Sequence, residues 1–249
     1  MQTTTGESAD YGYDAPYALV IFAVIGAAGA IGAVIAWHHG NRRLTAMLAL
    51  YGVFFLGNAL SFFYTTRRGK FAVWDDVLDH LELRGDERAL DLGCGRGAVL
   101  VAAAKRLPAG RAIGVDLWRT RDQSGNAGSV TRRNASLEGV LERVSIVTAD
   151  LRALPFADQS FDLVVSSLTI HNIAGRRDRV AAVNEAWRVL KPGGRLLIAD
   201  IRTTALSARA LEAQGAGPTR RRLGWRFWYG NPFAATTLVT ASKPLSPSS

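Results

Sequence analysis

Three glycines stand close together beside a carboxylate in the stretch Leu90-Asp91-Leu92-Gly93-Cys94-Gly95-Arg96-Gly97-Ala98. This pattern predicts a buried strand that turns directly into a helix. Glycines allow the backbone angles of a tight turn and let a ligand lie against the backbone, and the helix N-terminus offers unpaired N–H groups. Asp116 ends the next predicted strand, 23 residues after Gly93, where such folds bind ribose hydroxyls. Together these residues predict a ligand that contains a nucleoside.

The glycine spacing alone does not identify that nucleoside. Gly93, Gly95 and Ala98 also satisfy the loose G-x-G-x-x-A fingerprint of dinucleotide-binding folds. A nucleotide (NAD)-dependent oxidoreductase is therefore one interpretation that the turn leaves open.

Four stretches of the chain together resemble the class I S-adenosylmethionine-dependent methyltransferases, and the resemblance covers about residues 74–244. Their order and spacing are similar to those of the type 11 branch, which includes the ubiquinone and menaquinone C-methyltransferases. The stretches are 90–97, 114–116, 149–167 and 185–196. Four motifs in one order are much more specific than one glycine turn.

The resemblance implies roles for the residues around the turn. Asp91 would hold the ammonium group of the cofactor's methionine, directly or through water, and Asp116 would accept the two ribose hydroxyls. The turn residues that make room for the methionine and the ribose are Gly93, Cys94, Gly95 and Gly97.

The resemblance also implies an adenine site beside the second and third strands. Leu117 or Trp118 would pack against the adenine, and Asp150 would accept a hydrogen bond from its amino group, with the backbone of Leu151 alongside. Ser166 would end the fourth strand beneath the sulfonium. The expected site therefore lies along one edge of the sheet.

His171 is the residue best placed to take a proton from a methyl acceptor. It follows the fourth predicted strand and should face the sulfonium from the carboxyl edge of the sheet. A base is needed only if the acceptor must lose a proton, because the cofactor carries its own leaving group. The structural alternative is that His171 hydrogen-bonds a lid or orients Asn172.

Two further segments are expected to shape the acceptor pocket. The polar loop 119–126 follows the ribose acid on the ligand side of the sheet, and the aromatic cluster 223–233 lies between the last two strands. The rings of that cluster could equally form ordinary core or a contact with a membrane surface.

The elements that must position these residues alternate between strand-like and helix-like segments from about residue 71 onward. The predicted strands are 88–92, 111–116, 144–148, 161–166, 195–200, 219–227 and 236–242. The predicted helices are 98–107, 130–138, 179–190 and 205–214, and 191–194 is the expected turn into the fifth strand. The fold class is therefore α/β, a Rossmann-like, mostly parallel sheet of seven strands with helices on both faces.

Two apolar runs precede this domain. Residues 17–37 and 44–64 are each 21 residues long and contain no charge. At roughly 1.5 Å per residue each helix would reach about 31 Å, which matches the hydrocarbon core of a bilayer. Small residues in the first run favour close helix packing, and Asn58 could hydrogen-bond across the pair. The six-residue connection 38–43 predicts an antiparallel transmembrane hairpin.

A cleaved signal peptide is the competing interpretation of the first run, but no Lys or Arg precedes Arg42. Basic residues on either side of the second run do not decide the orientation. Because the implied cofactor is cytosolic, we expect an integral membrane protein with its catalytic domain on the cytoplasmic face. The expected division is a tail over 1–16, two transmembrane helices over 17–64, a juxtamembrane linker or helix over 65–80, the methyltransferase domain over 81–245 and a tail over 246–249.

Composition limits the partners of the chain. The formal charge is +9 over 249 residues, but only four of the 30 basic residues are lysines. This arginine bias is more typical of genome composition than of a nucleic-acid-binding patch, and the hairpin argues against a nucleic-acid substrate. The single cysteine, Cys94, excludes an intramolecular disulfide and a Cys-based zinc cluster, and no metal is expected.

The sequence thus predicts a membrane-anchored enzyme that transfers a methyl group from S-adenosyl-L-methionine to a small lipophilic acceptor, such as a quinone, an isoprenoid or a lipid. Two alternatives stay open. One is the NAD-dependent oxidoreductase, and the other is a non-catalytic membrane-anchored module that keeps the fold to bind the cofactor or a partner. Nothing in the sequence predicts an oligomeric state.

Overall fold

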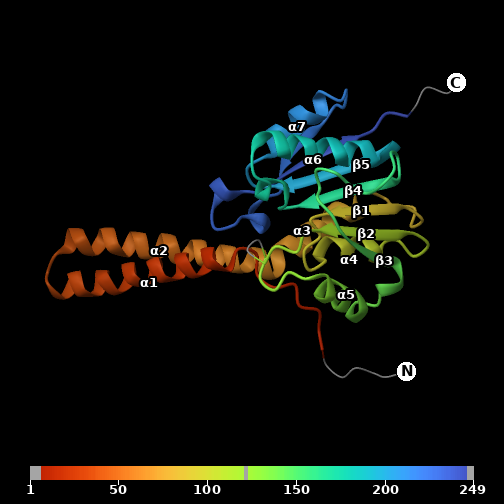
Figure 1. Cartoon of the computed structure of the whole chain (residues 1–249). Helices are drawn as coiled ribbons and strands as arrows, with labels where there is room; N and C mark the ends of the chain where they lie inside the picture. Colours follow the sequence, from red (N-terminus) through yellow and green to blue (C-terminus); the bar gives the residue numbers. More distant parts are fainter. Residues whose placement is uncertain (1–6, 121–122, 246–249) are drawn as a thin grey trace.

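A seven-stranded sheet forms the body of the protein (Figure 1). The computed structural model describes residues 7–120 and 123–245. The expected tail 246–249, the first six residues, and Arg121 and Asp122 of the polar loop lie outside the described residues. The strands are β1 Arg88–Leu92, β2 Arg111–Asp116, β3 Val144–Thr148, β4 Phe161–Ser167, β5 Leu190–Asp200, β6 Thr219–Arg222 and β7 Thr237–Ser242. Their order is β3-β2-β1-β4-β5-β7-β6, with β1 to β5 parallel and β7 antiparallel to both of its neighbours.

Helices cover both faces of this sheet (Figure 1). The side chains of a strand alternate between the two faces, so in β4 Leu163 and Val165 join one apolar cluster and Val164 joins the other. The first cluster contains residues of α3, α4 and α5, and the second contains residues of α6 and α7. These helices are α3 Lys70–Asp79, α4 Ala98–Lys105, α5 Gly128–Leu137, α6 Arg176–Val189 and α7 Thr204–Glu212.

The predicted strands are confirmed in number and order, and four boundaries are wrong. Strand β4 ends one residue later than predicted and β7 begins one residue later, and the two larger errors concern β5 and β6. Strand β5 begins at Leu190, because the segment expected to be a turn pairs with the chain beyond β7 through Gly193 N–H to Lys243 C=O. The strand expected over 219–227 ends at Arg222, since Gly224 takes a positive φ of 79° and a short 3-10 turn, η4 Trp225–Phe227, follows.

Two long antiparallel helices, α1 Pro16–His38 and α2 Arg42–Tyr64, project away from the sheet (Figure 1). They approach closely at small residues, because a Cβ at Gly29 would lie 2.9 Å from the backbone nitrogen of Gly52. Both helices extend beyond the apolar runs, so the connection is three residues long rather than six, and the Asn41 side chain accepts a hydrogen bond from Leu44 N–H.

The second helix continues without a loop into the sheet domain. A π-helical turn, η1 Thr65–Gly69, joins α2 to α3, so that one helical stretch runs from Arg42 to Asp79. This joint packs against the aromatic segment that follows β6. Thr65 Oγ1 donates to the Trp228 carbonyl at 2.6 Å, and a Cβ on Gly69 would overlap the Arg226 carbonyl oxygen.

The expected hydrogen bond of Asn58 across the helix pair is wrong. Its amide donates to Phe54 C=O one turn earlier in α2, at 2.7 Å, and its side-chain oxygen accepts from Asn231 at 2.7 Å. The residue therefore connects the helix pair to the sheet domain, because it lies near the end of α2 that faces that domain.

Residues 7–15, which precede α1, fold back over the sheet domain. Asp10 and Asn134 exchange two hydrogen bonds, Tyr13 and Ser124 exchange two more, and Asp14 forms an isolated β-bridge with Gln123. We call residues 7–15 the strap. It crosses α5 and the loop after β2 on its way to the helix pair.

Candidate active site

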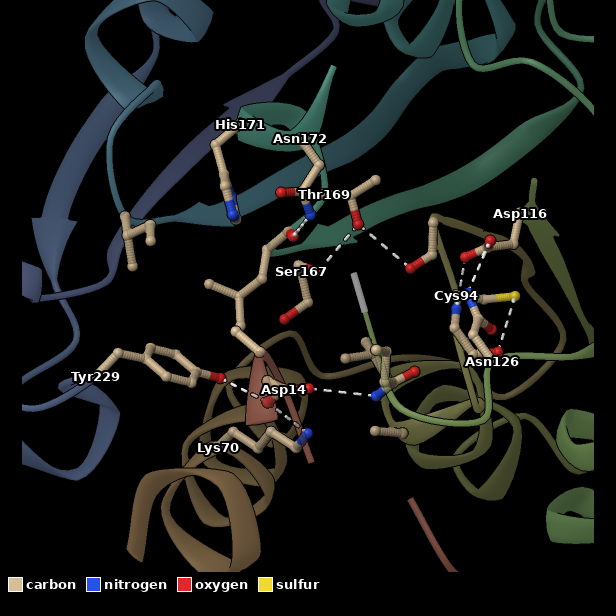
Figure 2. Close-up of a pocket in the computed structure, with 18 of the residues that line it drawn as sticks. Asp14, Lys70, Cys94, Asp116, Asn126, Ser167, Thr169, His171, Asn172 and Tyr229 are labelled. Carbon is tan, nitrogen blue, oxygen red and sulfur yellow. Dashed lines mark hydrogen bonds and ion pairs between the residues drawn. The ribbon is translucent and has the colours of Figure 1, made fainter. Parts of the chain in front are cut away.

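A cavity of about 1120 Å³ lies at the carboxyl ends of β1, β2 and β4 (Figure 2). Its walls come from several parts of the chain: the strap, the base of the helix pair, the glycine turn after β1, and the segments that follow strands β2 to β6. Of the described residues singled out in the sequence for a site, the cavity brings together Asp91, Gly93, Cys94, Gly95, Asp116, Leu117, Asp150, Leu151 and His171.

The glycine turn is shaped by the side chains that press against it. Gly93, Gly95 and Gly97 all have positive φ, at 71°, 50° and 89°. A Cβ at Gly93 would overlap the Thr169 side chain, and one at Gly95 would overlap the amide of Gln123. The sequence explains the glycines by their angles, and Gln123 belongs to the predicted polar loop 119–126, but Thr169 carries no motif and was missed.

Asp116 is anchored where the ribose acid is expected. One carboxylate oxygen accepts from Gly95 N–H at 2.9 Å, and the other accepts from Trp118 N–H at 2.6 Å and from the Asn126 amide at 3.2 Å. These bonds fix the carboxylate between the glycine turn and the loop after β2. Its oxygens keep further acceptor capacity toward the cavity.

Two buried acceptor oxygens beside the glycine turn lack a partner among the described residues. They are Oδ1 of Asp91 and Oδ1 of Asn126. Burial, together with the nearby charge of Asp116, raises the pKa of Asp91 to about 8. A buried acceptor without a donor is costly, and a cationic or hydroxyl-bearing ligand would satisfy both atoms. This chemistry fits an ammonium group near Asp91 and ribose hydroxyls near Asn126.

Cys94 lies between these groups as a small buried loop residue. Burial raises the pKa of its thiol well above the ordinary value, with the charges of Asp91 and Asp116 adding to the effect. The thiol is therefore protonated and is not a nucleophile.

Of the residues expected to contact the adenine, some line the cavity and one does not. Leu117 lines the cavity and Leu151 lies buried next to it. Trp118 turns away, because its backbone has a positive φ of 59° and its indole N–H donates to Thr148 Oγ1 at 2.7 Å. Asp150 lines the cavity, but both of its carboxylate oxygens bind Arg152, which lowers the pKa of Asp150.

Ser166 does not face the cavity, contrary to expectation. Its hydroxyl donates to Leu92 C=O at 3.2 Å inside the sheet, and the residue is fully buried. Strand β4 extends one residue further than predicted, so the neighbouring Ser167 points to the cavity face and accepts from Trp74 Nε1 at 2.9 Å.

His171 lines the cavity from the short 3-10 turn η3 Ile170–Asn172 after β4 (Figure 2). Its Nδ1 lies 2.7 Å from Oδ1 of Asp200, the last residue of β5, and its backbone N–H donates to the other carboxylate oxygen at 3.0 Å. Asp200 is completely buried. Since a carboxylate only accepts hydrogen bonds, Nδ1 carries the proton and Nε2 is free to accept one. Asp200 was missed because it has no motif of its own.

In each of the two predicted pocket segments, 119–126 and 223–233, only some residues line the cavity. Gln123 and Asn126 of the polar loop line the cavity. In the aromatic cluster Tyr229 lines the cavity, Phe227 belongs to the core, and the exposed Trp225 stacks on Tyr64 with ring centroids 5.3 Å apart.

Comparison with known proteins identifies relatives of the sheet domain. Residues 90–198 match the family model described as methyltransferase domain. The chain is 36% identical over 133 residues to the ubiquinone/menaquinone biosynthesis C-methyltransferase UbiE of Dinoroseobacter shibae, a match that covers 53% of this chain and 50% of that protein. It is 35% identical over 115 residues to the demethylmenaquinone methyltransferase of Roseiflexus castenholzii, covering 46% of this chain and 42% of that one. The chain therefore spans about half the length of the curated relatives it matches.

Solved structures share the fold at lower identity. The geranyl diphosphate C-methyltransferase of Streptomyces coelicolor, solved with Mg²⁺, geranyl diphosphate and S-adenosyl-L-homocysteine, superimposes with a TM-score of 0.57 at 18% identity. The superposition covers 72% of this chain and 80% of that structure.

Proposed function

We propose that this chain, which carries a methyltransferase domain over residues 90–198 in a Rossmann-like methyltransferase fold, transfers a methyl group from S-adenosyl-L-methionine to a small lipophilic acceptor of the quinone type. The observation that carries the proposal is the pair of carboxylates, Asp91 and Asp116, that flank the glycine turn in one cavity. The acceptor class follows the names of the relatives and the apolar wall that the helix pair adds to this cavity.

The residues present fit this cofactor. Asp91 would hold the ammonium of its methionine, Asp116 with Asn126 would hold the ribose hydroxyls, and Leu117 with Leu151 would enclose the adenine. When bound, S-adenosylmethionine supplies a methyl group on a positively charged sulfur together with a thioether leaving group. The strap and the helix base supply walls that keep water from the reacting atoms.

His171 would take the proton that an acceptor hydroxyl or ring carbon must lose. Asp200 holds the imidazole by Nδ1, which leaves Nε2 directed at the cavity as the accepting atom (Figure 2). The buried carboxylate also stabilises the imidazolium that forms. The proton can then leave through the open side of the cavity.

Membrane anchoring by α1 and α2 is part of the proposal. Both helices are long and apolar enough to cross a bilayer. In the most apolar 18-residue stretch of each helix, only 17% and 22% is buried. Such exposure does not suit the core helices of a soluble protein. The strap and the sheet domain lie at the same end of the pair, so both would face the cytoplasm, where the cofactor is made. A reporter fused after Ser249 that is active only outside the inner membrane would contradict this orientation.

The proposal is tested by calorimetric titration of the full-length chain in detergent with S-adenosylmethionine, S-adenosylhomocysteine and NAD(H). The full chain is required, because a fragment starting at Phe71 would lack the strap and Lys70. We expect micromolar binding of the first two ligands, at roughly −8 kcal/mol, and none of NAD(H). Preference for NAD(H) would support the oxidoreductase, and cofactor binding without methyl transfer to demethylmenaquinol would support the non-catalytic module.

Cofactor affinity is expected to rise with pH because of Asp91. The pKa of Asp91 is raised to about 8 in the free protein, so a cationic ligand that needs the carboxylate must displace a proton below that pH. We expect affinity to increase by roughly twentyfold between about pH 6 and 7.5, with release of about one proton, measured by titration in buffers of different ionisation enthalpy.

The variant Asp91→Asn provides the control for this pH dependence. It should bind more weakly, with an affinity that no longer changes over the same range. Because the folded pKa lies above the unfolded one, the stability contributed by protonated Asp91 is lost as pH rises toward about 8. The ligand-free variant should therefore melt higher than the wild type near pH 8, and equal affinity of the wild type at both pH values would refute the role of Asp91.

Replacing His171 is expected to slow turnover without weakening the binding of the cofactor. We predict that His171→Ala lowers kcat by about a hundredfold or more, as measured by transfer of labelled methyl groups. Asn172→Ala is the matched control, since Asn172 lines the same wall from the same turn. If Asn172→Ala reproduces the loss, His171 acts by orienting Asn172 and is not the base.

A further inference from the structure

A polar cluster lines the cavity at the base of the helix pair, on the side away from the glycine turn (Figure 2). Oδ2 of Asp14, from the strap, accepts from Lys70 Nζ at 2.7 Å and from the Tyr229 hydroxyl at 2.8 Å. Oδ1 of the same residue accepts from the Gln123 amide at 3.2 Å. Three distant segments of the chain thus donate to one carboxylate of the strap. We call Asp14, Lys70 and Tyr229 the headgroup cluster.

The Lys70 ammonium is buried with only part of its donor capacity used. Its side chain is 6% exposed, and Asp14 is its one hydrogen-bond acceptor in the described part of the chain. An ammonium has three N–H donors, and a buried ion pair is favourable only when its remaining donors also find partners. Because Lys70 lines the cavity, an oxygen atom of a bound molecule can supply one.

The wall around this cluster is apolar and continues into the helix pair. Ala18 and Phe22 of α1, Phe62 of α2 and Trp74 of α3 line the same cavity. The Phe62 ring packs edge-on against Tyr229 with centroids 5.1 Å apart. A molecule whose head reaches Lys70 would therefore have its chain against side chains of α1 and α2.

We propose that Asp14, Lys70 and Tyr229 bind the uncharged, oxygen-bearing head of a long-chain apolar acceptor, with the chain lying against Phe22 and Phe62. This inference rests on the proposed function and adds the place where the acceptor is held. His171 faces the cluster across the cavity, so a head bound there lies between the proton acceptor and the helix pair (Figure 2).

The charges of the cavity favour an uncharged head over a diphosphate. Asp14 already neutralises Lys70, and among the described lining residues acidic side chains outnumber basic ones by seven to five. A diphosphate would need an excess of positive charge to offset its desolvation. A hydroxyl or carbonyl needs only donors such as the Lys70 ammonium.

Photolabelling of the full-length chain in detergent micelles tests this site. Three diazirine probes with the same tail are compared, namely analogues of farnesol, of farnesyl diphosphate and of the corresponding hydrocarbon. We expect the alcohol to label peptides that contain Phe22, Phe62 or Tyr229 about tenfold more than either other probe. A tenfold difference in affinity is what one hydrogen bond to a charged donor provides. Equal or stronger labelling by the diphosphate, or labelling elsewhere, would overturn the proposal.

Variants separate the binding site from general folding. Lys70→Met and Tyr229→Phe should each lower labelling by the alcohol probe to the level of the hydrocarbon probe. Lys70→Met alone leaves the Asp14 carboxylate buried without its ion-pair partner. The double variant Asp14→Asn with Lys70→Met removes that charge and should lower the labelling to the same level. Lys105→Met, which removes a half-exposed lysine of the same cavity, should leave labelling unchanged. Labelling that persists in all the cluster variants would also overturn the proposal.

Cofactor titration of each protein distinguishes the failure of the headgroup site from the failure of the proposed function. Wild-type chain that takes the alcohol probe at this site but binds no S-adenosylmethionine would refute the proposed function and leave the headgroup site standing. Chain that binds the cofactor and methylates demethylmenaquinol, with no labelling at the cluster, would refute the site alone.

Discussion

Replacing Asp116 by alanine is expected to weaken S-adenosylmethionine binding by at least about a hundredfold, because two hydrogen bonds from the ribose to a charged acceptor are lost. The carboxylate also accepts from Gly95 N–H, Trp118 N–H and the Asn126 amide, so its removal leaves the glycine turn and the next loop without their common anchor. Both effects act in the same direction. Calorimetric titration of the full-length variant measures the change.

A matched acid variant shows whether the effect belongs to the site. Asp162 also accepts a backbone N–H, from Arg88 at 2.9 Å, and pairs with Lys191, but it stands at the opposite end of the sheet from the cavity. Asp162→Ala should cost stability and leave cofactor affinity within about twofold of the wild type. Unchanged cofactor affinity in Asp116→Ala would rule out this aspartate as the ribose-binding residue.

The second large effect is expected at the joint between the helix pair and the sheet domain. A Cβ on Gly69 would overlap the Arg226 carbonyl oxygen, which is backbone and cannot rotate away. Gly69→Ala should therefore push η1 from the segment after β6, at a cost of about 2–3 kcal/mol, the usual range for overpacking. For a domain of this size that is roughly 5–10 °C in melting temperature.

Gly57→Ala is the control for the same chemical change. Gly57 lies within α2, and a Cβ there would meet no atom within 4 Å, so alanine gains helix propensity and should stabilise the chain by up to about 1 kcal/mol. The two variants should thus shift the melting temperature of the detergent-solubilised chain in opposite directions. Faster proteolysis near Trp228 in Gly69→Ala alone would locate the damage at the joint, and equal melting of both variants would refute the predicted clash.

The fold could be predicted well because its signals are local. The apolar runs of β1, β2 and β3, the glycines between β1 and α4, and the length of the two apolar helices each follow from a few adjacent residues. Errors arose where pairing overrode local preference. Residues 191–194 look like a turn from Pro192 and two glycines, yet they pair with the chain after β7.

Within the site, residues next to the glycine turn could be predicted, and those brought in by long-range packing could not. Ser166 was preferred to Ser167 because a one-residue error in the end of a strand exchanges the two faces. Asp14 and Lys70 belong to no motif. Their positions did hold a usable signal, since a hairpin brings its two ends together and these opposite charges stand just outside its two apolar runs.

The unbroken helical stretch from Arg42 to Asp79 affects how an anchored enzyme would meet its acceptor. A flexible tether would let the catalytic domain search a volume of solution, whereas a continuous helix holds the cavity at a constant height above the lipid. Encounters then occur by lateral diffusion in two dimensions. The turnover rate would follow the mole fraction of acceptor in the bilayer, so diluting the membrane with inert lipid should slow it even when the total acceptor in the sample is unchanged.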